Sequence, residues 1–198
     1  MAVRITSGEF RGRRVALPRG SRARPLTGQA LEQVMNLFTP ARLSSGPFLD
    51  VCAGSGLAGL EALSRGAPLL LSVDVDSAAL RGIRRLAAEW GAADRLLTLR
   101  RDGRRCFAPA QRLLPEGQRF ACALLDPPFI EGMAAELLRG LGPAAAECLD
   151  ASALAIIRTP DRLPEGVAGL EFIGCRDAGR ARLWLYRPAD APQGGEAP

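Results

Sequence analysis

Residues 48–59 have the sequence FLDVCAGSGLAG, which predicts a buried strand, a glycine turn and the first turn of a helix. The strand is apolar except for Asp50. Gly54 and Gly56 permit backbone angles that a side chain would forbid, so the chain can turn tightly and lie against a ligand. Because the helix that follows begins with free backbone N–H groups, a nucleotide-like ligand is favoured at this turn.

Two classes of ligand fit this turn. Gly54, Gly56 and Gly59 have the spacing G-x-G-x-x-G, which is typical of dinucleotide-binding proteins such as nicotinamide-dependent dehydrogenases. Asp50 favours another ligand, because a carboxylate repels a pyrophosphate and attracts an ammonium group; its alternative role is to cap the turn. S-adenosylmethionine carries an ammonium and a sulfonium group without phosphate, and we predict it as the cofactor. The cofactor-binding residues predicted here are Asp50, Ala53, Gly54, Ser55 and Gly56.

Strand and helix patterns alternate along the chain from residue 48 onward. The strands are expected at residues 48–52, 68–75, 95–100, 120–125 and 154–158, with a last pair at 169–175 and 181–187. The helices are expected at residues 28–39, 57–63, 77–90, 131–141 and 143–149. This alternation predicts an α/β fold of the Rossmann-like type, with a mostly parallel, doubly wound sheet and helices on both of its faces. Residues 2–17 predict a small β-hairpin ahead of this fold.

Carboxylates follow four successive predicted strands, at Asp50, Asp74, Asp102 and Asp126. The ends of parallel strands meet at one edge of a sheet, which is where ligands bind. Asp74 has the spacing from the glycine turn of an acid that binds ribose hydroxyls, although it could instead cap the next helix. Asp102 and Gly103 are expected to lie over the adenine of the ligand, or else to form an ordinary turn.

The segment Asp126-Pro127-Pro128-Phe129 follows a predicted strand directly. Two prolines fix the backbone and remove two N–H donors, which leaves carbonyl oxygens free to accept. A planar base with an exocyclic amine fits this segment, since the amine can donate to the Asp126 carboxylate and the Pro127 carbonyl while the ring stacks on Phe129. Such acceptors turn the amine lone pair toward a methyl donor and stabilise the positive charge that develops. The alternative is a rigid turn that ends a strand.

The positive charge of the chain is concentrated at its N-terminus. Residues 1–24 contain seven arginines and one acid, a net charge of +6, while the remaining residues have a net charge of −1. All 26 basic residues are arginine, which coding bias explains, but bias does not explain their clustering. We therefore predict that this segment binds a polyanion such as a nucleic acid.

The composition excludes several other kinds of protein. The 198 residues are enough for one α/β domain with a sizeable core. Histidine is absent and the five cysteines are scattered without a C-x-x-C pair, so we expect reduced thiols, no metal and no imidazole base. No apolar run approaches the roughly 20 residues that span a bilayer, and the N-terminus does not resemble a signal peptide. A cytoplasmic protein that does not bind a membrane is expected.

Three stretches resemble one family. Residues 126–129 resemble the [N/D]-P-P-[Y/F] signature of methyltransferases that modify exocyclic amines of nucleobases. Residues 48–67, FLDVCAGSGLAGLEALSRGA, are similar to the bacterial 16S ribosomal RNA guanine-N2 methyltransferase D family. The N-terminal part of the resemblance is carried by Arg4-Ile5, Gly8, Phe10-Arg11-Gly12-Arg13, Arg24-Pro25, Thr27, Glu32 and Asn36. Gly28 departs from the pattern, because the family usually has an acid at this position.

This resemblance implies a methyl donor, a substrate and a set of contacts. It implies S-adenosylmethionine as cofactor and a guanine of small-subunit rRNA, within an assembled or partly assembled subunit, as methyl acceptor. Asp126, Pro127 and Phe129 would hold the base, and the cofactor contacts would include Asp74, Asp102 and Gly103. The residues implied to meet RNA are Arg4, Arg11, Arg13, Arg14 and Arg24. We expect a monomer with a basic arm at 1–26, a methyltransferase domain at 27–187 and a disordered tail at 188–198.

The sequence leaves three other functions open. An amino-methyltransferase that acts on adenine, in RNA or DNA, would use the same segment at residues 126–129. A non-catalytic RNA-binding paralogue would keep the fold and the basic arm without turnover. A dehydrogenase would use the glycine turn but would have no role for residues 126–129.

Overall fold

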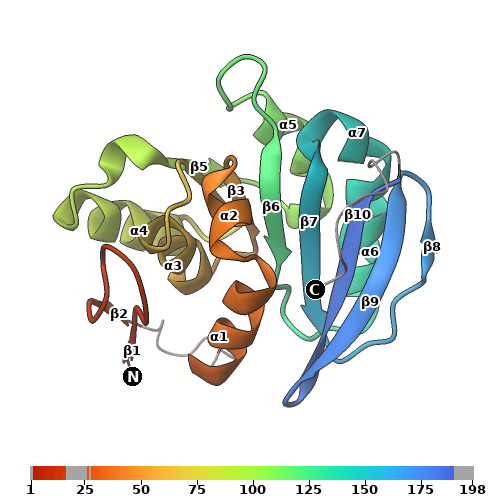
Figure 1. Cartoon of the computed structure of the whole chain (residues 1–198), viewed down its shortest axis with the longest axis horizontal. Helices are drawn as coiled ribbons and strands as arrows, with labels where there is room; N and C mark the ends of the chain where they lie inside the picture. The colour runs from red at the N-terminus through yellow and green to blue at the C-terminus, as the bar shows by residue number, and fades with distance from the viewer. Residues whose placement is uncertain (1, 17–25, 27, 190–198) are drawn as a thin grey trace.

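The computed structural model describes residues 2–16, 26 and 28–189. Within them one sheet has the strand order β5-β4-β3-β6-β7-β10-β9-β8 (Figure 1). Strands β3 to β7 pair in parallel, and β10, β9 and β8 continue the sheet antiparallel, which confirms the predicted fold class. The strands are β3 (Phe48–Val51), β4 (Leu70–Asp74), β5 (Leu96–Arg100), β6 (Phe120–Leu125), β7 (Leu149–Thr159), β8 (Gly166–Val167), β9 (Leu170–Ala178) and β10 (Ala181–Pro188).

The strand order reverses between β3 and β6. The chain moves outward from β3 through β4 and β5 and then returns to the other side of β3 as β6. Val51 pairs in register with Leu125, so the carboxyl ends of β3 and β6 lie side by side. In doubly wound sheets, ligands bind at the carboxyl ends of the strands at such a reversal. The fold therefore brings the glycine turn and residues 126–129 to one place.

Helices cover both faces of the sheet, because alternate strand residues point to opposite sides. Phe48 and Leu124 belong to a core cluster with the first four helices, whereas Leu49 and Leu125 belong to a cluster with the last three. The helices are α1 (Gly28–Leu37), α2 (Pro40–Ser44), α3 (Leu57–Ser64), α4 (Ser77–Glu89), α5 (Phe107–Gln111), α6 (Met133–Leu141) and α7 (Ala145–Cys148). Single 3₁₀ turns are η1 (Ala93–Arg95), η2 (Gly103–Arg105) and η3 (Gly142–Ala144).

Two of the predicted elements have other bounds. The helix expected at residues 28–39 ends at Leu37, and a short helix that was not predicted begins at Pro40. The two are separate because Pro40 has no N–H group and the preceding Thr39 has a φ of 43°. Strand β7 covers Leu149–Thr159 and thus begins five residues before the expected start at residue 154. The remaining predicted elements are present with ends that differ by a few residues.

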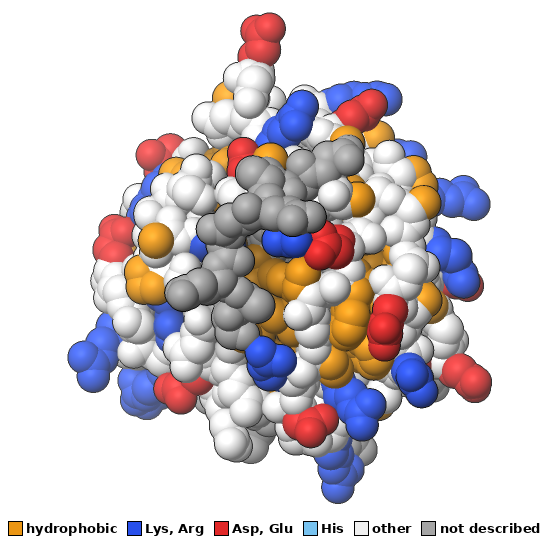
Figure 2. All heavy atoms as spheres, turned by 45° about the vertical axis from the view of Figure 1, so that its right-hand side comes forward, with side chains coloured by type: hydrophobic (Ala, Val, Ile, Leu, Met, Phe, Trp, Pro, Cys, Tyr) orange, Lys and Arg blue, Asp and Glu red, His pale blue; other side chains and the backbone are white. Residues whose placement is uncertain are grey.

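The far end of the sheet is covered less completely. In Figure 1 no described helix crosses the front of β9 and β10. Figure 2 brings this side forward and shows hydrophobic side chains gathered at its centre, with arginines and acids around them. Among the described residues no helix is long and apolar enough to cross a bilayer.

The N-terminal hairpin forms a separate two-stranded sheet that packs on the main core. Strands β1 (Ala2–Arg4) and β2 (Arg14–Ala16) pair antiparallel. Ile5, Phe10 and Val15 are at most 1% exposed and belong to the same core cluster as α1 and α3. The hairpin that the sequence predicted is confirmed. The boundaries proposed at residues 26 and 187 stay predictions, and the tail beyond residue 189 lies outside the described residues.

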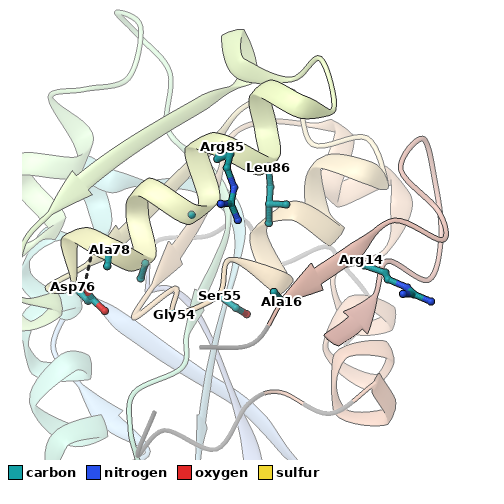
Figure 3. Close-up of a pocket in the computed structure, with 10 residues that line it drawn as sticks. Arg14, Ala16, Gly54, Ser55, Asp76, Ala78, Arg85 and Leu86 are labelled. Atoms are coloured by element: carbon teal, nitrogen blue, oxygen red, sulfur yellow. Dashed lines mark hydrogen bonds between the residues drawn. The ribbon is translucent and has the colours of Figure 1, made fainter. Parts of the chain in front are cut away.

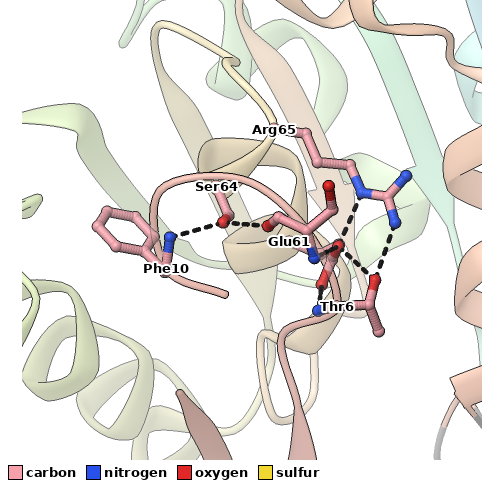
Figure 4. Close-up of polar contacts among 6 residues, drawn as sticks. Thr6, Phe10, Glu61, Ser64 and Arg65 are labelled. Atoms are coloured by element: carbon pink, nitrogen blue, oxygen red, sulfur yellow. Dashed lines mark hydrogen bonds and ion pairs between the residues drawn. The ribbon is translucent and has the colours of Figure 1, made fainter. Parts of the chain in front are cut away.

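A buried carboxylate on α3 fastens the hairpin to the main domain. Glu61 is fully buried and accepts hydrogen bonds from the Thr6 N–H group and the Thr6 hydroxyl, both at 2.8 Å, and from the Ser7 N–H group at 3.2 Å (Figure 4). Its Oε1 also lies 2.7 Å from Nε of Arg65. Gly8 then passes so close to α3 that a Cβ there would overlap the carbonyl of Ser64.

Candidate active site

The turn after β3 has the left-handed backbone that its sequence predicts. Gly54 and Gly56 have φ angles of 54° and 75°, and a Cβ on Gly56 would lie 2.5 Å from Cγ1 of Ile83. The Gly56 N–H group donates to the Ala53 carbonyl at 2.8 Å, which closes the turn. Helix α3 then begins at Leu57, and its N-cap residue Gly56 has no side chain to bond to the first N–H groups, of which the third, on Gly59, donates to the Asp50 carboxylate. The start of α3 can therefore take part in binding a ligand.

Asp50 is buried beneath this turn. Its side chain Oδ2 accepts a hydrogen bond from the Gly59 N–H group at 3.2 Å, and the residue is only 1% exposed. Burial, together with the charges of the neighbouring carboxylates Asp126 and Asp74, raises the pKa of Asp50 to about 7. A cation bound here would favour the ionised carboxylate, which makes Asp50 a suitable partner for an ammonium group.

We expect Asp50→Asn to stabilise the fold and to weaken cofactor binding. The unfolded Asp50 carboxyl loses its proton near pH 3.8 and the folded one near 7, so the folded wild type becomes less stable as pH rises between these values. Asparagine does not ionise, and above pH 7 the variant should gain up to about 4 kcal/mol. Thermal unfolding of both proteins at pH 5 and pH 8 measures this. If the stabilities of the two proteins changed with pH in the same way, Asp50 would not have the raised pKa that this prediction assumes.

Asp74 ends β4 and holds the glycine turn. Its Oδ2 accepts a hydrogen bond from the Gly54 N–H group at 2.8 Å, and its Oδ1 accepts one from the Asp76 N–H group at 2.9 Å. The N-cap of α4 is Asp76, whose carboxylate accepts from the Ala78 N–H group at 2.7 Å, so the alternative that Asp74 caps this helix is wrong. Each carboxylate oxygen of Asp74 keeps a further lone pair for ribose hydroxyls.

Asp102 and Gly103 form a capped turn at the end of β5. The Asp102 carboxylate accepts a hydrogen bond from the Arg104 N–H group at 2.9 Å and pairs with the Arg104 guanidinium. The hydrogen bonds from the Arg104 side chain lower the pKa of Asp102 to about 2. A Cβ on Gly103 would lie 2.8 Å from Cγ1 of Val51, so this glycine lets the loop lie against the end of β3. Contact with adenine stays a prediction.

Residues 126–129 form a corner where β6 ends. The Asp126 N–H group donates to the Val51 carbonyl at 3.0 Å, which places the corner beside the glycine turn. The Ile130 N–H group donates to the Pro128 carbonyl at 2.7 Å and closes the corner. Within the described part of the chain no donor bonds to the Pro127 carbonyl. The corner therefore offers the carbonyl acceptor that the sequence predicted.

The structure adds a residue to this corner that sequence reasoning missed. Nε and Nη2 of Arg158 donate to the two carboxylate oxygens of Asp126, at 2.6 and 3.0 Å. The guanidinium carbon lies 4.9 Å from the ring centroid of Phe129. The side chains of Arg158 and Asp126 are 8% and 17% exposed. The acceptor corner is thus a three-residue assembly of carboxylate, aromatic ring and guanidinium.

The model of a family described as "Conserved hypothetical protein 95" matches residues 3–187. Ribosomal RNA small subunit methyltransferase D of Escherichia coli strain K12 is 32% identical to this chain over 152 residues, which cover 74% of this chain and 72% of that protein. The chain belongs to this methyltransferase family. The resemblance seen in the glycine turn and in the corner is therefore confirmed.

Solved structures share the methyltransferase fold over nearly the whole chain. The yhhF protein of Escherichia coli superposes with a TM-score of 0.74 and 25% identity, covering 96% of this chain and 99% of that one. An RNA methyltransferase from Salinibacter ruber, solved in complex with S-adenosyl-L-homocysteine, has a TM-score of 0.59 at 13% identity and covers 86% of this chain and 98% of that one. The second likeness shows the fold alone.

Two exposed apolar side chains lie next to predicted site residues. Val75 is 62% exposed directly after Asp74, and Ile130 is 60% exposed directly after Phe129. Each follows a predicted site residue directly in the sequence, and an apolar residue at such a position is the signal that could have identified them. No sequence signal marked Cys52, which has a φ of 64°, a strained value for a residue with a side chain. Among the described residues no group of three or more His, Cys, Asp or Glu could hold a metal ion.

Four of the five arginines predicted to meet RNA lie on the N-terminal hairpin. Arg11 and Arg14 are exposed. Arg4 donates to a backbone carbonyl within the hairpin at 2.9 Å. Arg13 lies over two aromatic rings at 5.6 Å and donates to a carbonyl at the end of α4 at 3.3 Å, so it also helps to hold the hairpin in place. Arg24 lies outside the described residues.

A cavity of about 420 Å³ separates the hairpin from the glycine turn (Figure 3). Arg14 of β2 and Arg85 of α4 line it together with Gly54 and Ser55 of the turn. In Figure 3 Arg85 and Leu86 project from α4 toward the turn. Residues of the basic hairpin and of the glycine turn thus line the same cavity.

Proposed function

We propose that this protein uses S-adenosylmethionine to methylate the exocyclic N2 amine of a guanine in small-subunit (16S) ribosomal RNA. The observation that supports this most strongly is the meeting of the glycine turn and the Asp126–Phe129 corner at the adjacent ends of β3 and β6. A cofactor turn and an amine-accepting corner must share a cavity in a methyltransferase, because methyl transfer is in line. The relatives named as small-subunit rRNA methyltransferases support rRNA as the substrate, and the N2 amine of guanine as the methylated atom is part of the proposal.

The residues at the turn fit S-adenosylmethionine better than a dinucleotide. Asp74 and Asp126 lie close enough to Asp50 for their charges to raise its pKa. This edge of the sheet is therefore acidic. An acidic edge suits an ammonium and a sulfonium group and repels a pyrophosphate. Asp74 has lone pairs for the ribose, and exposed Val75 offers an apolar surface to the adenine.

The chemistry needs positioning more than a strong base. When bound, the cofactor supplies a methyl group activated by the sulfonium charge. The Asp126 carboxylate and the Pro127 carbonyl accept the two amine hydrogens and thereby aim the nitrogen lone pair out of the base plane. Phe129 stacks on the base. Asp126 also stabilises the positive charge that develops on the nitrogen in the transition state.

Nucleoside analysis tests the proposed reaction. Small subunits and naked rRNA from cells that lack this protein are incubated with wild-type protein and isotopically labelled S-adenosylmethionine, and the digested nucleosides are separated by mass spectrometry. We expect label in N2-methylguanosine and more of it in subunits than in naked rRNA. Label in N6-methyladenosine would favour the adenine alternative. No label in either substrate would favour a non-catalytic RNA-binding paralogue.

We expect the exposed hairpin arginines to contribute salt-dependent RNA affinity. The double variant Arg11→Ala/Arg14→Ala should bind rRNA more weakly and should lower the slope of log K against log salt by about 1 to 2, since two phosphate contacts are lost. Binding isotherms at several salt concentrations measure this. A matched control is Arg112→Ala/Arg139→Ala, which removes two exposed arginines from α6 and the end of α5. Equal effects of both pairs would contradict an RNA-binding hairpin.

The setting of the reaction is also part of the proposal. Ribosomal RNA is folded and assembled in the cytoplasm of bacteria, so a cytoplasmic enzyme that acts on the assembled or partly assembled subunit is expected. We propose that it acts as a monomer, and sedimentation of the protein at assay concentration tests this.

A further inference from the structure

Arg158 and Asp126 occupy matching positions on neighbouring strands. Leu125 of β6 pairs in register with Ile157 of β7. The residues that follow them, Asp126 and Arg158, therefore also lie side by side. In parallel strands, paired positions point to the same face of the sheet. The two-point hydrogen bond between Arg158 and Asp126 therefore follows from the register of the sheet and does not depend on a chance side-chain conformation.

We propose that Arg158 is a positioning residue of the acceptor site, which fixes the plane of the Asp126 carboxylate and the ring of Phe129 for the incoming amine. The proposal rests on the proposed amine-methyltransferase function. Arginine suits this role because its planar guanidinium can bond to both carboxylate oxygens and stack on an aromatic ring at once. A lysine could supply the charge but only a single point of contact.

This arrangement leaves defined places for the base. A carboxylate has about four lone-pair positions, and Arg158 takes one from each oxygen of Asp126. The remaining positions on Asp126, together with the Pro127 carbonyl, can accept the amine hydrogens. The guanidinium lies over one face of Phe129, and the base would stack on the other face. Arg158 and the base can therefore bind the corner together.

The charges around Asp126 explain why it needs a cation. Among the residues that the structure describes, the titratable groups that face it are Asp50 and Cys52 at the end of β3 and Arg158 on β7, with Asp74 of β4 beyond Asp50. Burial raises the pKa of Asp126, and the charge and hydrogen bonds of Arg158 lower it. Without Arg158 the carboxyl would keep its proton to a higher pH, and the protonated form is a poorer acceptor for an amine.

Kinetics across a pH series tests the proposal with three variants. At pH 7 we expect Arg158→Met to lower kcat by about tenfold or more, because each unit of pKa rise removes up to tenfold of the ionised form. The loss should shrink toward pH 9, and the KM for S-adenosylmethionine should stay within about twofold. Arg158→Lys should recover part of the rate. The control is Arg187→Met, which breaks a similar two-point pair with Glu171, at 2.8 and 2.8 Å, far from the corner.

Several outcomes would overturn the proposal. They are an unchanged pH profile in Arg158→Met, an equal loss in Arg187→Met, or a faster reaction with tighter RNA binding, which would mean that the guanidinium obstructs the base. Titration of the ¹³C-labelled Asp126 carboxyl by NMR is a second readout that needs no turnover. Its midpoint should move to higher pH in Arg158→Met. If the wild type transfers no methyl group, the proposed function fails, whereas this titration still decides the role of Arg158.

Discussion

Replacement of Asp126 by alanine is expected to lower the rate of methyl transfer by about 10²- to 10³-fold, the range seen when one preorganised transition-state contact is removed. The carboxylate accepts an amine hydrogen, and it stabilises the charge that develops on the nitrogen. Binding of S-adenosylmethionine should weaken far less than the rate falls, because the hydrogen bond between Asp74 and the glycine turn does not involve Asp126 and the carboxylates of Asp50 and Asp74 remain. Single-turnover rates and calorimetric titration with the cofactor separate the two effects.

Asparagine at the same position is the matched variant. Asp126→Asn keeps a carbonyl oxygen as acceptor and gives the other form of the methyltransferase signature, so its rate should lie between those of the wild type and the alanine variant. Both substitutions remove the charge that faces Arg158, and melting temperatures therefore have to be compared with the rates. An alanine variant that methylates at the wild-type rate would show that Asp126 does not hold the amine.

Replacement of Glu61 by alanine is expected to destabilise the protein by about 3–5 kcal/mol, the cost of removing one partner from a buried ion pair. The substitution leaves the Thr6 and Ser7 N–H groups without their acceptor and leaves the Arg65 guanidinium unpaired. Since these contacts hold the hairpin on α3, hydrogen exchange of the hairpin amides should also become faster. Urea unfolding and hydrogen exchange measure the two effects.

A surface pair of the same spacing is the control for Glu61. Arg85 and Glu89 on α4 are also four residues apart, but their side chains are 71% and 57% exposed and their closest atoms are 3.6 Å apart. Glu89→Ala should change the stability by less than about 1 kcal/mol. Equal destabilisation by the two alanine variants would contradict the anchoring role of Glu61.

The sequence predicted the features that depend on local chemistry. The glycine turn follows from two glycines at positions that need positive φ, and the corner at residues 126–129 follows from two prolines after an apolar strand. The break before Pro40 was also visible in the sequence, because proline cannot donate the hydrogen bond that a continuous helix requires. The predicted helix accordingly ends before Pro40, two residues beyond the observed end at Leu37, because its apolar spacing extends to Phe38; the short helix Pro40–Ser44 was not predicted.

The features that the sequence did not predict depend on contacts between distant segments. Arg158 is one of 26 arginines, and only the register of β6 with β7 places it against Asp126. Glu61 resembles an ordinary helix acid with an arginine four residues later, and only the docking of the hairpin buries it. The left-handed φ of 64° at Cys52 was likewise not marked by any sequence pattern. Each of these needs the tertiary structure.

The central claim is that the methyl donor and the acceptor corner share one cavity at the ends of β3 and β6. A crystal structure of the protein with bound S-adenosylmethionine tests it most directly. We expect the ammonium group near Asp50, the ribose on Asp74 and the sulfonium methyl group directed at the space between Asp126, Pro127 and Phe129. A donor bound elsewhere, or a methyl group directed away from this corner, would contradict the claim.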